Sequence, residues 1–264
     1  MSHWTEHSCN TNNISLHCTR TGTGKTPLIL LHGLAANGAC WIDVALALED
    51  DYDVLMPDLR GHGKSSVPLY SYRYEDHAAD IAGFIEALGI APVLLMGHSM
   101  GGLVAAVVAS QFPALVRGLI LADPTFISVQ QRREVRDVDV ADQHRKLLSK
   151  PLEEVVADLR ARQPHRSLAT LERIARARLE TSLAAFDVLT PPNPDHESLM
   201  RSIEVPTLLV TAERGVVSKD LAARLQAANP GMQTAEIRDA GHGLFYDQPE
   251  RFSAVVRSFL TNGT

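Results

Sequence analysis

The sequence predicts an α/β protein with a mostly parallel central sheet, helices on both faces of that sheet, and a helical cap insertion. Short apolar runs rich in Val, Leu and Ile recur along the chain, as in strands that are buried on both faces. Segments with helical spacing alternate with these runs, which favours right-handed crossovers between parallel strands. One stretch of about 70 residues contains helical patterns but no strand-like run.

Composition and charge limit the classes of partner. The chain has 264 residues, of which 45% are hydrophobic and 21% charged, as in a folded globular protein. The formal net charge is −6 and Lys and Arg form no long run, so neither nucleic acid nor an anionic lipid surface is an expected partner. The composition does not indicate an oligomeric state.

Compartment is predicted from the cysteines and the N-terminus. Cys9, Cys18 and Cys40 form no CxxC pair, which favours free thiols in a reducing compartment. The first residues, "MSHWTEHSCN", lack the basic-then-apolar order of a signal peptide, and no apolar run approaches the roughly 20 residues of a membrane helix. We therefore expect a cytoplasmic protein with no membrane span.

The elements are predicted in order along the chain. A polar N-terminal segment is expected to form two antiparallel strands, at about 3–9 and 13–20. Buried strands are expected at 27–33, 52–59, 91–99, 116–124, 205–213 and 232–239. Helices are expected at about 41–49, 74–88, 100–112, 218–229 and 249–261.

Residues 127–200 break this alternation. Their apolar residues recur at helical spacing among many charges, until "TPPNPD" at 190–195 ends the helical part because proline cannot continue it. The strand "PTLLVTAE" follows soon after. We therefore expect residues 1–126 and 201–264 to form one core domain and 127–200 to form a cap over the carboxyl edge of its sheet.

The stretch "VLLMGHSMGGLVAA", at 93–106, places Ser99 between a predicted strand and a predicted helix. Gly97, Gly101 and Gly102 leave room for a tight turn of the backbone. This is the G-x-S-x-G pattern of a nucleophile elbow, in which the serine hydroxyl stands exposed at the carboxyl edge of a sheet. A serine needs a base within hydrogen-bond reach before it can act as a nucleophile at neutral pH.

His242 is the predicted base among eleven histidines. It follows the last predicted strand and lies between two glycines, and the order of serine first and histidine last is typical of the elbow fold. His98 and His62 are expected to be structural. The remaining histidines on polar segments are expected on the solvated surface: His77, His144, His165 and His196.

Four motifs carry a resemblance to a known family. "LLHGLAANG", "DLRGHGKSS", "GHSMGG" and "AGHG" occur in this order, and with them the chain resembles the α/β-hydrolase fold family over nearly all of its length outside the cap. The resemblance implies that fold, a serine nucleophile, and an oxyanion hole made by the backbone N–H groups of Leu34 and Met100. It does not specify a substrate.

The acid of the triad departs from the usual pattern of that family. Members commonly carry it after the strand that follows the cap, and here the matching position holds Gly215. Asp123, at the end of the preceding strand, is the predicted acid, because some lactone hydrolases and haloalkane dehalogenases of the family use that location. Glu213 is the alternative acid.

The sequence thus predicts a serine hydrolase that acts on a small, largely apolar ester or lactone through Ser99, His242 and Asp123. Phe126, Leu244 and Phe245 are expected to line an apolar substrate pocket with almost no charge. No metal-binding motif occurs, so neither a metal nor another cofactor is expected. The alternatives are a C–C bond hydrolase, lyase, perhydrolase or cofactor-free dioxygenase on the same fold, and a non-enzymatic small-molecule receptor.

Overall fold

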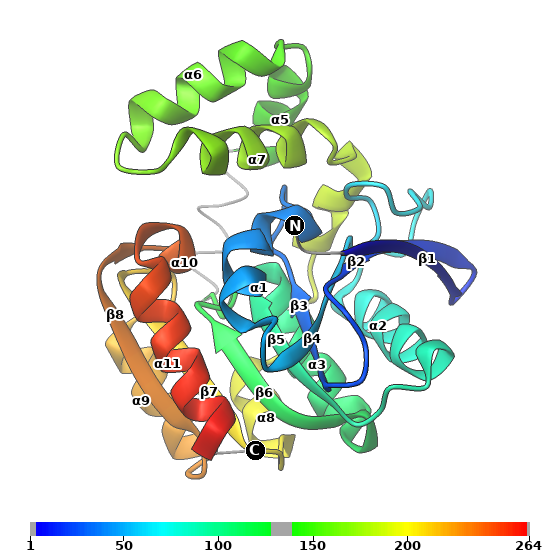
Figure 1. Ribbon diagram of the computed structural model, residues 1–264. Helices are drawn as coiled ribbons and strands as arrows, with labels where there is room; N and C mark the ends of the chain where they lie inside the picture. Colours follow the sequence, from blue (N-terminus) through cyan, green and yellow to red (C-terminus); the bar gives the residue numbers. More distant parts are fainter. Residues whose placement is uncertain (1–3, 128–138, 263–264) are drawn as a thin grey trace.

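The computed structural model describes residues 4–127 and 139–262, and in this part of the chain an eight-stranded sheet forms the centre (Figure 1). The strand order is β1-β2-β4-β3-β5-β6-β7-β8. β1 pairs antiparallel with β2, and β2 antiparallel with β4, whereas every pair from β4 to β8 is parallel. The strands are β1 (Thr5–Thr11), β2 (Ile14–Arg20), β3 (Thr26–Leu31), β4 (Tyr52–Pro57), β5 (Val93–His98), β6 (Val116–Ala122), β7 (Thr207–Arg214) and β8 (Gln233–Gly241).

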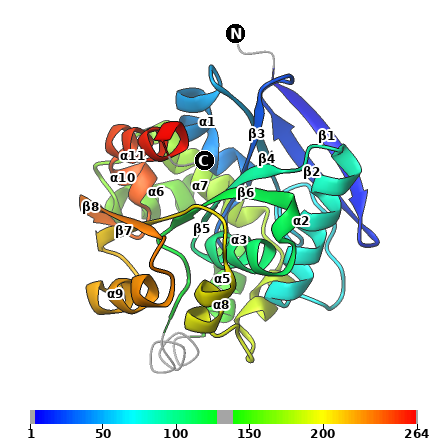
Figure 2. The same cartoon turned by 90° about the horizontal axis from the view of Figure 1, so that it is seen from below.

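Helices cover both faces of this sheet (Figure 2). One face carries α1 (Ile42–Leu48) and α11 (Pro249–Asn262), and the other carries α2 (Tyr74–Leu88), α3 (Met100–Gln111) and α9 (Lys219–Ala228). Alternate residues of β3 divide between the two faces: Ile29 and Leu31 join one hydrophobic cluster, while Leu28 and Leu30 join the other. Both clusters are closed off from solvent, as expected for a parallel sheet.

The predicted fold class is confirmed. The α/β order, the parallel pairing and the helices on both faces agree with the expectation, and the element boundaries differ by a few residues. The apolar runs predict strands well because both faces of the central strands are buried. No helix in the described part of the chain has the length and apolar character needed to cross a membrane.

Three helices lie together over one end of the core, and we call them the cap helices (Figure 1). They are α5 (Val140–Leu148), α6 (Leu152–Arg162) and α7 (Leu168–Leu179). They share a small hydrophobic cluster that includes Val155, Leu159 and Leu171. The Ser167 side chain caps α7 by accepting a hydrogen bond from the Thr170 amide at 3.1 Å.

The chain then returns to the core. A 3₁₀ segment at Leu183–Leu189 is followed by α8 (His196–Ser202), which packs against α3 and α9. A short helix, α10 (Leu244–Asp247), precedes α11, and two more 3₁₀ turns lie at Gly38–Trp41 and Pro113–Leu115. The expected cap boundaries at 127 and 200 stay a prediction, and the helical pattern expected at 128–138 lies outside the described residues.

Candidate active site

Ser99 lies in the sharp turn between β5, which ends at His98, and α3, which begins at Met100. Its backbone has φ 53° and ψ −120°, a strained conformation for a residue other than glycine. The backbone can turn this tightly because nearby positions 97 and 101 are glycines, which have no side chain. A Cβ at Gly97 would overlap the carbonyl oxygen of Gly101, and one at Gly101 would overlap that of Leu31.

The register of the parallel strands brings the next polar residue beside this turn. His98 of β5 pairs with Ala122 of β6, and the Ser99 amide donates to the Ala122 carbonyl at 3.2 Å. Asp123 follows at once, and its amide donates to the Val210 carbonyl of β7 at 2.8 Å. Ser99 and Asp123 therefore lie at the same carboxyl edge of the sheet, one strand apart.

His242 lies between these two residues. It follows the end of β8, its Nε2 lies 2.9 Å from Ser99 Oγ, and its Nδ1 lies 2.6 Å from Asp123 Oδ2. Because an ionised carboxylate only accepts, Nδ1 carries the proton and donates to Asp123, which leaves Nε2 to accept from the serine hydroxyl. The geometry is that of a nucleophile, its base and the group that orients the base.

The carboxylate of Asp123 is held in place by the chain after β7. The side chain has no exposed surface, and its two oxygens accept hydrogen bonds from the amides of Val216 at 2.8 Å and Val217 at 3.0 Å. A buried carboxylate needs such partners, since burying an unpaired charge is costly. These donors and the His242 ring fix the direction in which the carboxylate points.

Gly215 and Glu213, the other positions considered for the acid, occupy different places. A Cβ built on Gly215 would lie 2.6 Å from both carboxylate oxygens of Asp123, so the carboxylate fills the space that a side chain at 215 would enter. Glu213 is half-exposed, and its Oε2 accepts from the amide of Asp239 at 2.8 Å. In the described structure the partner of His242 Nδ1 is Asp123.

Two further residues contact the triad: Thr125, which went unrecognised in the sequence, and His98, which was expected to be structural. Thr125 Oγ1 lies 3.2 Å from Ser99 Oγ, and the Thr125 amide donates to the Ser99 carbonyl at 3.0 Å. His98 is buried, as expected of a structural residue, and its Nε2 donates to the carbonyl oxygen of His242 at 2.8 Å. His98 thus holds the backbone of His242 in place. The Thr125 hydroxyl was missed because a threonine two residues after Asp123 carries no distinguishing sequence signal.

Leu34 and Met100, the expected oxyanion-hole positions, flank the serine. Met100 is the first residue of α3, and Leu34 follows Gly33, where a Cβ would lie 3.1 Å from the Cβ of Ser99. Backbone N–H groups at a helix N-terminus favour a negative charge. The two positions therefore lie where amide groups could face an oxygen attached to the carbon that Ser99 attacks.

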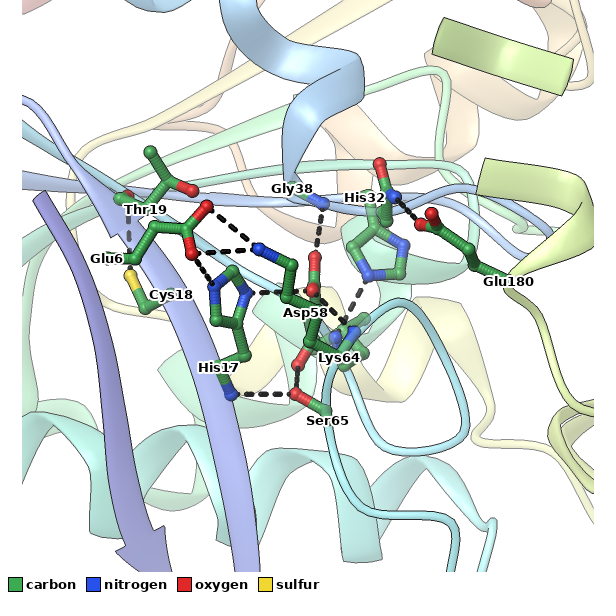
Figure 3. Close-up of polar contacts among 12 residues, drawn as sticks. Glu6, His17, Cys18, Thr19, His32, Gly38, Asp58, Lys64, Ser65 and Glu180 are labelled. Carbon is green, nitrogen blue, oxygen red and sulfur yellow. Dashed lines mark hydrogen bonds and ion pairs between the residues drawn. The ribbon is translucent and has the colours of Figure 1, made fainter. Parts of the chain in front are cut away.

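A buried polar network supports the loop that carries Leu34 (Figure 3). Asp58 accepts hydrogen bonds from the amides of Gly38 at 2.7 Å and Lys64 at 3.0 Å, and its other contact is His17 Nδ1 at 2.9 Å. These bonds lower the pKa of the Asp58 carboxyl despite its burial, and Asp58 in turn raises the pKa of His17. The His32 Nε2 accepts from the amide of Leu59 at 2.9 Å, which directs the Nδ1 proton to the Gly33 carbonyl.

A cavity of about 970 Å³ opens beside Ser99 and His242, and residues of all three cap helices line it. The expected apolar lining by Phe126, Leu244 and Phe245 is wrong. All three are buried in the hydrophobic clusters. The ring centres of Phe126 and His196 lie 5.5 Å apart, and those of Phe245 and Trp41 lie 4.2 Å apart.

The lining is instead mixed, with apolar cap residues such as Val155, Leu159 and Ile174 beside polar and charged ones. From the loop after β8 the cavity takes Gly241, His242, Gly243, Tyr246 and Asp247, and from the cap helices and the turns between them it takes basic residues for which the sequence predicted no role. Arginines repeated through α6, α7 and the turn between them were the available signal. Without the fold, nothing shows which of them turn inward.

The predictions for the other histidines are confirmed at some positions and wrong at others. His62 is fully buried with its Nδ1 2.9 Å from the Arg60 carbonyl, so its structural role is confirmed. His165 is exposed, as expected, and contacts Asp247. His77 and His144 are buried, so their assignment to the surface was wrong. Both lie on amphipathic helices whose inner faces the sequence pattern did not separate from the outer ones.

Comparison with known proteins places this geometry in a family. Residues 26–249 match the model of the alpha/beta hydrolase fold. N-formylmaleamate deformylase of Pseudomonas putida is 30% identical over 264 residues, which covers 94% of each chain.

Solved structures agree. The crystal structure of E-2-(acetamidomethylene)succinate hydrolase superposes with a TM-score of 0.86 at 25% identity, over 98% of this chain and 100% of that one. A malate-bound thermophilic esterase from Thermogutta terrifontis superposes with a TM-score of 0.80 at 27% identity, over 97% of this chain and 98% of the esterase. With its fold, its elbow and its matched sequence, the chain belongs to the α/β-hydrolase fold family.

Proposed function

We propose that the protein is a cofactor-free serine hydrolase that cleaves a carboxylic ester or lactone. The observation that carries this proposal is the unbroken hydrogen-bonded chain from Ser99 through His242 to Asp123, with separations of 2.9 Å and 2.6 Å. Ser99 lies at a strained elbow, beside a cavity large enough for a small substrate.

The proposed reaction has two stages. Ser99 Oγ attacks the substrate carbonyl while His242 Nε2 takes the hydroxyl proton, and Asp123 stabilises the imidazolium that forms. The amides of Leu34 and Met100 would bind the oxyanion, an effect worth roughly 3 kcal/mol for each donor. His242 then protonates the leaving alcohol, and a water molecule activated by the same imidazole cleaves the acyl-enzyme.

A second candidate is cleavage of an amide-type bond. It is favoured by the similarity to N-formylmaleamate deformylase, which matches this chain along nearly its whole length. The similarity to an esterase favours the ester reading. Both reactions pass through an acyl-enzyme on Ser99. The two candidates therefore differ in the leaving group that His242 protonates, an alcohol or an amine.

Replacement of the nucleophile tests the proposal. Ser99→Ala is expected to remove turnover of short-chain 4-nitrophenyl esters while keeping the circular dichroism spectrum of the wild type. Ser110→Ala is a matched control on α3, because the Ser110 hydroxyl contacts Ser202 rather than the triad. Residual activity of Ser99→Ala above about a tenth of wild type would reject the assignment.

Covalent labelling gives an independent readout. A fluorophosphonate is expected to add one phosphonyl group per chain, on the peptide that contains Ser99, and to leave Ser99→Ala unlabelled. Peptide mass spectrometry locates the adduct. An adduct on another residue, or none at all, would favour the non-hydrolytic readings, including a receptor built on this fold.

A further inference from the structure

The cavity beside Ser99 is basic although the chain as a whole is acidic. The net charge of the protein is −6. Among the described residues, six lysines and arginines line the cavity against two aspartates. The basic residues are Lys146, Lys150, Arg162, Arg166, Arg178 and Arg214. A wall of one sign attracts ligands of the opposite sign.

Most of these cations already have an acidic partner within the protein. Lys146 pairs with Asp142 at 2.7 Å, Lys150 with Asp158 at 2.8 Å, and Arg166 with Asp247 at 2.7 Å. Arg214 lies 3.7 Å from Glu213. Within residues 4–127 and 139–262, Arg162 and Arg178 have no ion pair.

Arg178 is the more informative of the two. It lies in the last turn of α7, half-buried, and burial together with the charges of Arg162 and Arg166 lowers its pKa. A guanidinium nevertheless stays protonated in a protein, so Arg178 remains a charged group without a counter-charge in the described structure. Burying a charge in this way is destabilising unless an anion pairs with it.

The charge of Arg178 is felt by neighbours on the His242 side of the cavity. The charge of Arg178 interacts with Tyr246 and Arg166. The Arg166 guanidinium lies 5.0 Å from the centre of the Tyr246 ring and packs on Gly243, where an added Cβ would lie 2.6 Å from Arg166 Nη2. Gly243 directly follows His242, so Arg166 adjoins the loop that carries the proposed base, and Arg178 lines the same cavity.

We propose that Arg178, with Arg162 of the same cavity wall, binds a carboxylate of the substrate, so that the compound cleaved at Ser99 carries a negative charge some distance from its scissile carbonyl. A guanidinium presents paired N–H donors that match a carboxylate. The proposal rests on the proposed hydrolase function and replaces the expectation of a largely apolar substrate.

A pair of matched esters tests this specificity. Wild-type kcat/KM is expected to be about 10- to 100-fold higher for 4-nitrophenyl hemisuccinate than for its neutral methyl ester, as for a hydrogen-bonded charge pair. Arg178→Gln should reduce that ratio to near one, with Arg178→Lys in between. Arg176→Gln is the matched control, since Arg176 is exposed on the same helix and does not line the cavity. It should keep the wild-type ratio.

Binding without catalysis separates this inference from the hydrolase proposal. Monomethyl succinate, titrated calorimetrically into Ser99→Ala, is expected to bind at least tenfold more tightly than to Ser99→Ala/Arg178→Gln, and less tightly as NaCl is added. This result would stand even if no ester were turned over.

Three results would overturn the carboxylate subsite. They are equal binding to both variants, equal effects of Arg178→Gln and Arg176→Gln, and inorganic phosphate binding as tightly as the monoester. The last would reveal a general anion site. If Arg178→Gln does not fold, Arg178→Lys carries the same comparison, with a smaller expected loss.

Discussion

At the scale of single residues, the acid of the triad shows how one side chain can replace another. Asp123 and Gly215 belong to the ends of neighbouring strands, and the Asp123 carboxylate fills the space into which a side chain at Gly215 would project. A carboxylate from either strand end would thus occupy the same place beside His242 Nδ1. The glycine at 215 is thus the structural counterpart of the aspartate at 123.

We predict that Asp123→Asn lowers kcat for an aryl ester by about 10²- to 10⁴-fold, because the amide favours the wrong imidazole tautomer. The asparagine keeps the shape of the aspartate, so the folded state should persist. Steady-state kinetics measure the loss. Glu213→Gln is the matched control and should remain within about twofold of wild type, since Glu213 contacts the Asp239 amide and Arg214 rather than His242. A larger loss from Glu213→Gln would shift the assignment to Glu213.

The shared space gives a second prediction, which relocates the acid. Asp123→Ala should lose activity, and Asp123→Ala/Gly215→Asp should regain part of it, because the new carboxylate enters the vacated space beside His242 Nδ1. Gly215→Asp alone should be destabilised by the clash and repulsion of two carboxylates. Activity and urea unfolding are measured on all three variants. A double variant no more active than Asp123→Ala would contradict the relocation.

At the scale of elements, the loop after β4 connects the segment that carries Leu34 to helix α2. The loop after β4 holds Gly38 through Asp58 and reaches α2 through Arg60, whose guanidinium bonds both carboxylate oxygens of Asp80 at 2.5–2.6 Å. Burial raises the pKa of Asp80 more than Arg60 lowers it, so desolvation dominates this pair. The cap helices attach nearby, where Asn37 Nδ2 donates to Glu180 Oε2 at 2.8 Å.

We predict that Asp80→Ala reduces the free energy of unfolding by about 3–5 kcal/mol, because Arg60 is left as a buried unpaired charge. The double variant Arg60→Met/Asp80→Leu should recover most of that loss, since removing both charges also removes their desolvation. Urea unfolding followed by tryptophan fluorescence measures both. Glu6→Gln, which breaks an exposed pair with Lys64, serves as the control and should have a much smaller effect. A double variant as unstable as Asp80→Ala would contradict the argument.

At the scale of the whole molecule, buried histidines set the response to acid. His32, His62, His77 and His98 are all buried, and burial lowers the pKa of each, for His62 to about 3. The unfolded chain binds protons at these rings near pH 6.5, whereas the folded protein does not. Their contribution to stability is therefore fully present above about pH 6.5 and falls as the pH drops toward their folded values.

We predict that the free energy of unfolding decreases from pH 7.5 to pH 5, by up to about 1.4 kcal/mol per pH unit below pH 6.5 for each such histidine. His17 opposes this trend, because its raised pKa adds stability as the pH falls. The lowered pKa of Asp58 matters only below about pH 4. Urea denaturation across this range measures the slope.

A variant isolates the histidine contribution. Neither ring nitrogen of His77 has a hydrogen-bond partner in the part of the chain that the structure describes. His77→Leu should therefore flatten the slope of stability against pH and leave the protein no less stable at pH 5. An unchanged slope would show that His77 does not contribute to the acid response.

The sequence by itself determined the order of strands and helices, the elbow at Ser99 and the choice of His242. These depend on local physics: apolar runs are required wherever a strand is covered on both faces, and a serine held at positive φ requires glycines beside it. The helices α5, α6 and α7 were predictable for the same reason, because helical spacing among charges is a local pattern.

Only the tertiary structure decided which carboxylate faces His242 and what lines the cavity. The place of Asp123 depends on strand register and on the amides of Val216 and Val217, which are separated from it by more than 90 residues. Phe126 and Phe245 turned into the core while Arg166 and Arg178 turned toward the cavity. The direction of a side chain depends on which elements pack against it, and short amphipathic helices leave that choice open.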